Sequence, residues 1–310
     1  MERPVASRPS RFPHLTDRRL PTFAIASAVV VYGLIIFGSY VRVTESGMGC
    51  PDWPLCKGNI GPIYEFHALM EQVHRYIAAL ATVLVLATML LALRIRTRPA
   101  AIRPAIFTAG VLVLQVVLGA VTVFAGNSAP TVAAHLLAGL ALLAGSTITA
   151  VCTLVPRHET PGPRLGSGVW VAISAAGLLY LSGSLIVNAE AEEACASFPF
   201  CPADQPGRLV ALHLVHRGIA VLAGIALFAF AIHAWRRWSV QRGARALAAT
   251  LAALVVATAA LGIISALLKA PPDLQNLHLA GAAAVLTTSV ALASLGWLTG
   301  ADYFTFIARD

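Results

Sequence analysis

Residues 72–93, QVHRYIAALATVLVLATMLLAL, decide the fold, because no charged side chain follows Arg75 within this stretch. A helix needs roughly 20 apolar residues to cross the hydrocarbon core of a membrane, which is about 30 Å thick. Runs of this kind occur at residues 22–43, 72–93, 104–125, 132–155, 167–188, 210–234, 245–268 and 275–299. The sequence therefore predicts an all-α membrane protein with eight transmembrane helices.

The composition excludes several other classes of protein. Of the 310 residues, 58% are hydrophobic and 12% are charged, whereas a soluble domain has about 45–50% apolar and about 25% charged residues. This chain is too apolar for a soluble or disordered protein. Five cysteines are too few for a small disulfide scaffold of this length. A membrane β-barrel would show alternating apolar residues instead of continuous runs.

The placement of positive charge predicts the orientation in the membrane. The net charge is +8, and 16 of the 22 Lys and Arg lie in the tails and in the loops after the second, fourth and sixth predicted helices. Lys57, Arg208 and Lys269 lie in loops on the other side. Positively charged loops stay in the cytoplasm, so we expect a multi-pass plasma-membrane protein with both termini cytoplasmic. Cytoplasmic loops thus explain the basic charge without nucleic acid.

The two halves of the chain repeat each other at a nearly constant offset. Gly38, Cys50 and Cys56 recur 145 residues later as Gly183, Cys195 and Cys201; His74-Arg75 recurs 142 residues later as His216-Arg217; Gly119 and His135 recur 143 residues later as Gly262 and His278. Four helices per repeat insert both halves the same way up. The repeat therefore predicts two parallel, pseudo-symmetric four-helix bundles.

The predicted bundles divide the chain into five parts. These are a cytoplasmic tail (1–21), an N-terminal bundle (22–155), a cytoplasmic linker (156–166), a C-terminal bundle (167–300) and a second cytoplasmic tail (301–310).

Each long outer loop carries a cysteine pair, Cys50 with Cys56 and Cys195 with Cys201. Disulfides persist outside the cytoplasm, so we expect two short-range disulfides. Four free thiols are the alternative, and a metal site is less favoured because the pairs lie on separate loops. Cys152, near the inner end of its helix, is expected to be a small buried hydrophobic residue.

Four repeat-related histidines are the candidate metal ligands: His74, His135, His216 and His278. Each lies a short distance inside the outer end of a helix, and all four helices run inward, so the rings share one depth. Two histidines facing each other in a bundle core are suited to bind heme iron axially. The alternative for any single histidine is a hydrogen bond at a helix interface. Zinc would require four converging ligands.

Three arginines near the outer surface are candidate contacts for heme propionates: Arg42, Arg75 and Arg217. An arginine can pair with a carboxylate through two parallel hydrogen bonds. The alternative is that these side chains extend to lipid phosphates.

The halves differ at one position next to the histidines. Glu71 precedes His74 by three residues, which places both on one helical face, and the matching residue in the second half is His213. Glu71 could relay protons or stabilise positive charge on a substrate carbon. The alternative is an interfacial carboxylate paired with Arg75.

Several of these segments resemble the heme A synthase family. The resemblance rests on residues 41–47 (VRVTESG), the following CPDWPLC (50–56), the Glu71-x-x-His74-Arg75 motif, His135, His216-Arg217 and His278. It covers essentially all eight predicted helices, and the Cys-Pro-Asp-Trp-Pro segment is specific. Residues 188–193 depart from the pattern, because they do not repeat the Val-Arg-x-Thr segment of the first half. The second half is therefore expected to lack a substrate-contacting loop.

The resemblance implies an enzyme that oxidises the C8 methyl group of heme O to the formyl group of heme A. The reaction would proceed through successive hydroxylations and loss of water, and the product would serve terminal oxidases. The implied partners are heme O as substrate, an electron donor that the sequence does not identify, and a heme O synthase.

The resemblance also assigns the candidate site residues. It implies resident heme b on His216 and His278, substrate heme on His74 and His135, catalytic Glu71 beside the substrate, and a role in activity for the pair Cys50 and Cys56. Heme b would relay electrons. Glu71 would stabilise a carbocation-like intermediate or deliver water, and the sequence leaves both roles open.

Two other functions remain as alternatives. A di-heme membrane electron-transfer cytochrome would bind two permanent hemes and would not need Glu71. A transporter or heme exporter built from a parallel repeat would move heme without changing it. The Cys-Pro-Asp-Trp-Pro loop and the inequality between Glu71 and His213 favour the enzyme.

Overall fold

The computed structural model describes residues 13–96, 98–155, 165–189, 191, 194–201, 207–238 and 241–299. Within them the chain forms α1 (Pro13–Val43), α2 (Phe66–Ile95), the short 3-10 helix η1 (Pro99–Ala101), α3 (Ile102–Phe124), α4 (Ala129–Leu154), α5 (Gly168–Asn188), α6 (Gly207–Arg237), α7 (Arg242–Leu267) and α8 (Pro272–Thr299). Eight helices in the described ranges are long and apolar enough to cross a membrane. The predicted all-α, eight-helix membrane fold is therefore confirmed.

Several helices extend beyond the predicted apolar runs. α1 begins at Pro13 and α2 at Phe66, whereas the runs begin at residues 22 and 72. Hydropathy marks only the part of a helix that lies in hydrocarbon, while backbone hydrogen bonding continues into polar flanks. Residues 13–21, assigned to a tail from the sequence, are therefore helical. Residues 1–12, 156–164 and 300–310, which hold most of the predicted tails and linker, lie outside the described residues, as do 190, 192 and 193.

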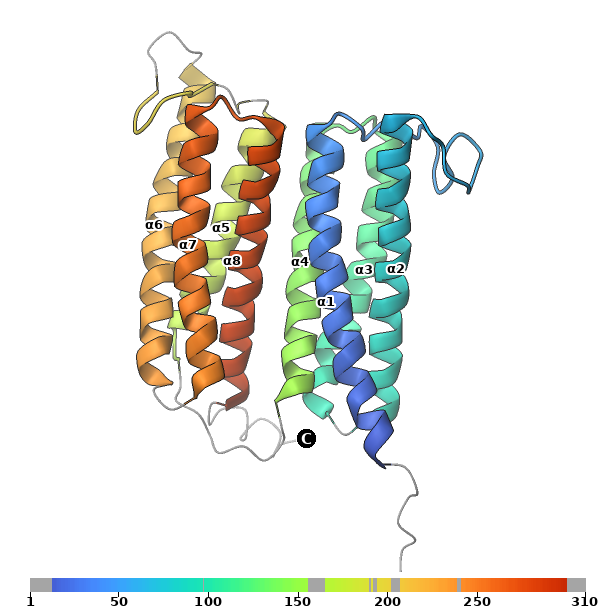
Figure 1. The fold of residues 1–310 in the computed structure, drawn as a ribbon, viewed down its shortest axis with the longest axis vertical. Helices are drawn as coiled ribbons and strands as arrows, with labels where there is room; N and C mark the ends of the chain where they lie inside the picture. The colour runs from blue at the N-terminus through green and yellow to red at the C-terminus, as the bar shows by residue number, and fades with distance from the viewer. Residues whose placement is uncertain are drawn as a thin grey trace, which may run out of the picture.

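The helices gather into two groups that lie side by side, α1–α4 and α5–α8 (Figure 1). The groups meet where α4 packs on α8, α1 on α8 and α4 on α5. Accordingly, α4 and α8 have 67% and 56% of their apolar windows buried, against 11–39% for the other six helices. The core of the molecule thus lies along α4 and α8, and the remaining helices present apolar faces outward.

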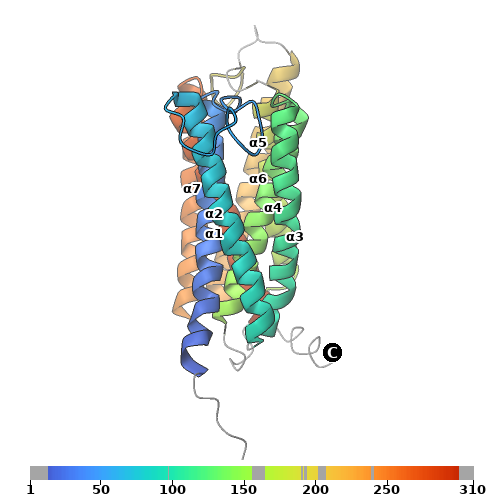
Figure 2. The ribbon, with the colours of Figure 1, turned by 90° about the vertical axis from the view of Figure 1, so that its right-hand side faces the viewer.

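The helices are nearly parallel to the long axis of the molecule, as the view turned by 90° also shows (Figure 2). The α1–α2 loop and the α5–α6 loop lie at the same end (Figure 1). Because α2, α4, α6 and α8 all begin at that end, residues near their N-termini share one level. This end of the molecule therefore carries the predicted functional residues.

Polar contacts join the two groups near this interface. Arg42 Nη2, at the end of α1, donates to the carbonyl of Val187, at the end of α5, at 2.7 Å. The hydroxyl of Tyr32 on α1 donates to the carbonyl of Ala280 on α8 at 3.0 Å. Arg42 thus bridges the two helix groups at the level of the α1–α2 and α5–α6 loops.

Candidate functional site

All four repeated histidines line one cavity that extends through both helix groups. The cavity has a volume of about 1880 Å³, above the roughly 300–1,000 Å³ of an ordinary small-molecule site. His74 on α2 and His135 on α4 line it in the first group, and His216 on α6 and His278 on α8 line it in the second. The structure therefore brings the predicted histidines to a single space.

A glycine on the neighbouring helix lies against each of these rings. An added Cβ would lie 2.8 Å from Cε1 of His74 at Gly38, 3.3 Å from Cε1 of His135 at Gly119, 3.4 Å from Cε1 of His216 at Gly183 and 2.8 Å from Cε1 of His278 at Gly262. Real Cβ atoms essentially never approach closer than 3.0 Å. Each imidazole thus lies in a notch beside a glycine. The notches of His74 and His278 have no room for a Cβ, that of His135 has little, and at Gly183 a Cβ would make an ordinary contact with His216.

Hydrogen bonds hold both histidines of the second group. Nδ1 of His216 lies 2.8 Å from Oγ of Ser182, which itself donates to the carbonyl of Leu179 at 3.0 Å. Nδ1 of His278 donates to the carbonyl of Thr258 at 3.0 Å. The ring of His278 therefore carries its proton on Nδ1 and keeps the Nε2 lone pair available, and Oγ of Ser182 is placed to accept the Nδ1 proton of His216 when Nε2 binds iron.

The histidines of the first group lack such support. Nδ1 of His74 and Nδ1 of His135 are buried and have no hydrogen-bond partner among the described residues. The ring of Phe37 lies nearly parallel to that of His74, with centroids 6.5 Å apart. Nε2 of His135 instead lies 3.2 Å from Nε2 of Gln115. The two pairs are thus similar in position and different in hydrogen bonding.

This donor set fits heme iron. Axial ligation needs only one or two imidazoles, and each helix group offers two, seated against glycines and directed at a cavity much larger than a metal ion. A structural zinc site would need four ligands. No cluster of three or more His, Cys, Asp and Glu suited to a metal ion occurs in the described part of the chain.

Glu71 lies one helical turn before His74, at the end of the cavity that is next to the α1–α2 loop. It is 4% exposed and lines the cavity. Its Oε2 accepts a hydrogen bond from the backbone N–H of Cys50 at 2.8 Å, and its Oε1 forms an ion pair with Arg75 Nη2 at 2.5 Å. The carboxylate is therefore fixed between α2 and the disulfide loop, and the ion pair that the sequence left as an alternative is present.

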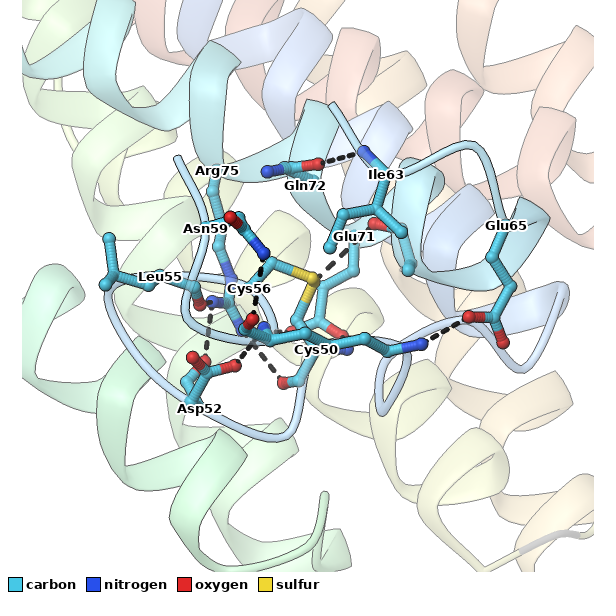
Figure 3. The surroundings of a disulfide bond; sticks show 12 residues. Cys50, Asp52, Leu55, Cys56, Asn59, Ile63, Glu65, Glu71, Gln72 and Arg75 are labelled. Atoms are coloured by element: carbon cyan, nitrogen blue, oxygen red, sulfur yellow. Dashed lines mark hydrogen bonds and ion pairs between the residues drawn. A yellow bond between two sulfur atoms is a disulfide. The ribbon is translucent and has the colours of Figure 1, made fainter. Parts of the chain in front are cut away.

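Arg75 fastens the α1–α2 loop to α2 (Figure 3). Its Nη2 donates to the carbonyl of Cys50 at 3.1 Å, and its Nη1 donates to the carbonyl of Asp52 at 2.7 Å and to that of Leu55. The predicted disulfide joins Cys50 and Cys56. One guanidinium group thus organises the loop around the disulfide.

The same contact recurs in the second half. Arg217 Nη2 donates to the carbonyl of Cys195 at 2.9 Å and Nη1 to that of Pro199 at 2.9 Å, and the second predicted disulfide joins Cys195 and Cys201. Arg42, Arg75 and Arg217 all line the cavity as well, so a contact with heme propionates stays a prediction for each. Cys152 is buried and free, as predicted.

Two further side chains shape the first loop. The carboxylate of Asp52 accepts the backbone N–H groups of Lys57 at 2.6 Å and Gly58 at 2.8 Å, and these bonds hold the pKa of Asp52 below its usual value. Gln72 accepts the N–H of Ile63 at 3.0 Å and donates to the carbonyl of Gly61 at 2.6 Å. The loop is therefore held to α2 along much of its length.

His213, which replaces Glu71 in the second half, also faces the loop between α5 and α6. It is buried, and its Nε2 donates to the backbone carbonyl of Ala191. An imidazole thus holds the second loop at the position where a carboxylate holds the first.

Sequence reasoning missed four residues that contact the histidines or the loop: Phe37, Gln72, Gln115 and Ser182. A signal for three of them was present. Phe37 and Ser182 are equivalent at the offset of 145, and Gln115 is equivalent to Thr258 at the offset of 143. Residues that differ at matched positions next to the histidines could therefore have been found from the repeat.

The fold and the site define an eight-helix membrane protein with two pairs of partly buried histidines around a common cavity and disulfide-closed loops at one end. The chain belongs to the cytochrome oxidase assembly protein family, whose model matches residues 21–68 and 63–290.

The chain is also similar to individual curated proteins. The chain is 28% identical over 244 residues to a heme A synthase of Bacillus licheniformis, covering 73% of this chain and 79% of that protein. It is 26% identical over 312 residues to a heme A synthase of Shewanella oneidensis, covering 85% and 92%. It is also 33% identical over 304 residues to a protoheme IX farnesyltransferase of Thermus thermophilus, covering 89% of this chain and 48% of that protein.

Proposed function

We propose that this chain is a heme A synthase, an oxidoreductase that converts the C8 methyl group of heme O to the formyl group of heme A for terminal oxidases. The family match and the names of the relatives support this activity. The observation that carries the proposal is the cavity itself, which is lined by two histidine pairs and, among the described residues, by a single buried carboxylate, Glu71, beside the first pair.

The two halves are assigned different hemes. The N-terminal bundle (22–155) binds substrate heme O through His74 and His135, and the C-terminal bundle (167–300) binds resident heme b through His216 and His278. The hydrogen bonds on Nδ1 of His216 and His278 support this assignment, because such bonds fix a ligating histidine in the tautomer that iron requires.

Within this assignment, heme b supplies the electron relay to the substrate. Glu71 acts on the substrate as the catalytic carboxylate, because it lies three residues before His74 and is held in place by Arg75 and by the N–H of Cys50. A carboxylate fixed in advance can stabilise positive charge on a carbon or hold a proton without reorganising during the reaction.

The setting of the reaction follows from the charge pattern and the relatives. The positive-inside rule places both termini in the cytoplasm and the disulfide loops outside the plasma membrane. Heme O is the substrate. Most of this chain matches about half of a protoheme IX farnesyltransferase, which is a heme O synthase. This match supports a heme O synthase as a partner of this chain.

The activity is tested by purifying wild type and Glu71→Ala from cells that make heme O and analysing the extracted hemes by HPLC with mass spectrometry. We expect heme A and heme b from wild type, and heme O or a hydroxylated intermediate in the variant. Heme b alone in both preparations would contradict the enzyme and favour an electron-transfer cytochrome.

A further inference from the structure

The ring nitrogen of a ligating histidine that does not bind the metal controls how well the other nitrogen binds. A hydrogen bond from that second nitrogen fixes the tautomer, orients the ring and raises the basicity of the ligand. The described residues around the four histidines differ in this respect from one half to the other.

We propose that Ser182 and the Thr258 carbonyl make the C-terminal site retain its heme, and that Phe37 and Gln115 make the N-terminal site an exchangeable one. The inference rests on the proposed function, because it takes both histidine pairs to bind heme. It adds four positioning residues, which act through the histidines and not on the reacting atoms.

In the C-terminal site, both Nδ1 atoms face an oxygen that can accept their proton. Oγ of Ser182 lies 2.8 Å from Nδ1 of His216 and 3.0 Å from the carbonyl of Leu179; when its own proton is donated to Leu179, its oxygen accepts from Nδ1. The carbonyl of Thr258 can only accept, so Nδ1 of His278 donates to it at 3.0 Å. Nε2 of His278 therefore keeps its lone pair, and Nε2 of His216 can bind iron while Nδ1 donates to Ser182.

In the N-terminal site, the equivalent positions give the opposite result. Phe37 replaces Ser182 at the offset of 145, and its ring packs against His74 without offering an acceptor to Nδ1. Gln115 replaces Thr258 at the offset of 143. Its amide engages Nε2 of His135 at 3.2 Å, whichever way the amide is turned.

Gln115 therefore competes with iron for His135, while the described residues offer Nδ1 of neither His74 nor His135 a hydrogen-bond partner. A heme that enters must displace the amide and order two unsupported rings. These are the properties of a site that accepts a substrate and releases a product. They would be a disadvantage in a site for a permanent cofactor.

The first test measures release of heme from the purified protein to excess apomyoglobin, together with the reduction potential of the bound heme. Ser182→Ala should release heme about tenfold faster than wild type and shift the potential. Ser182→Thr, which keeps the hydroxyl, should restore slow release. Ser294→Ala is the matched control, because this buried serine bonds within α8 to Val290 at 2.7 Å and should behave as wild type.

The second test isolates the N-terminal site by replacing both His216 and His278 with alanine and titrating the protein with ferric heme. Gln115→Leu in this background should bind the added heme several-fold more tightly. If Ser182→Ala releases heme at the rate of Ser294→Ala, or Gln115→Leu leaves the affinity unchanged, the inference is wrong although the proposed function stands. A wild-type protein that holds no heme would overturn the proposed function, and the inference with it.

Discussion

Arg75 in the first half and Arg217 in the second make the same contact, each donating to the carbonyl of the first cysteine of its disulfide loop. One helical turn earlier the two halves differ. Glu71 accepts a hydrogen bond from the N–H of Cys50, whereas His213 donates a hydrogen bond to the carbonyl of Ala191. The repeated arginine serves the shared scaffold. The replaced neighbour indicates where the chemistry of the two halves differs.

The largest difference is expected from removing one ligand in each half. His278→Ala should strongly lower the content of resident heme b, because one of its two imidazole ligands is lost. His74→Ala should keep heme b, because its ring lies in the other site. Heme content per polypeptide, measured as the pyridine hemochrome, checks both. Loss of heme b from His74→Ala would contradict the assignment of sites.

The next largest difference in heme A formation is expected between variants of Glu71 and His213, which occupy matched positions in the two halves. Glu71→Gln should lower heme A formation by about 100-fold or more, the range expected for loss of a group that transfers a proton. His213→Gln should lower it far less, because an amide can still donate to Ala191. Initial rates by HPLC with mass spectrometry check this, with the exposed Glu65→Gln as control. Equal losses at positions 71 and 213 would remove the distinction between the halves.

The disulfides extend the comparison to the loops. Replacing both Cys50 and Cys56 by serine should lower heme A formation about tenfold, because a hydrogen bond to a charged group is worth about 1.5–3 kcal/mol and the N–H of Cys50 binds Glu71. The same change at Cys195 and Cys201 should have a smaller effect, since no carboxylate depends on that loop in the described residues. The same rate assay measures both variants, and equal rates would contradict the link to Glu71.

A smaller effect, on the rate of heme release, is expected from replacing two glycines in the C-terminal site by alanine. Gly262→Ala would place a Cβ 2.8 Å from Cε1 of His278, whereas Gly183→Ala would place one 3.4 Å from Cε1 of His216. The first change must shift its ring and should speed heme release several-fold, and the second should be nearly neutral. Heme transfer to apomyoglobin distinguishes them, and the reverse order would contradict the packing described for these notches.

The smallest effect concerns the acid sensitivity of the first loop. Hydrogen bonds from Gly58 and Lys57 lower the folded-state pKa of Asp52, so this contribution is present above the unfolded pKa and is lost as the pH falls through the folded value. The protection factors of the loop amides in hydrogen exchange, corrected for the intrinsic rate at each pH, should therefore decrease below about pH 4. Asp52→Asn should lack this step. An identical acid profile in the variant would contradict the role of Asp52.

Much of this architecture could be predicted from the sequence. Eight apolar runs mark the helices, and the repeated cysteines and histidines predict the disulfides and the four positions around the cavity, because these signals depend only on composition and spacing. The pairing of Glu71 with Arg75 could be anticipated from their spacing of four residues, but the contacts of Arg75 and Arg217 with the loop carbonyls could not, since the path of a loop over a helix end leaves no periodic pattern. The partner of His135 likewise depends on how α3 packs against α4.

The claim that the two sites differ in heme retention is tested most directly by isolating each site in the full-length protein. One variant carries His74→Ala with His135→Ala, the other His216→Ala with His278→Ala, and each is titrated with ferric heme in the same detergent. We expect the first variant, with only the C-terminal site, to bind heme at least about tenfold more tightly and to release it more slowly. Equal affinities, or tighter binding at the N-terminal site, would contradict the division into a retained and an exchangeable heme.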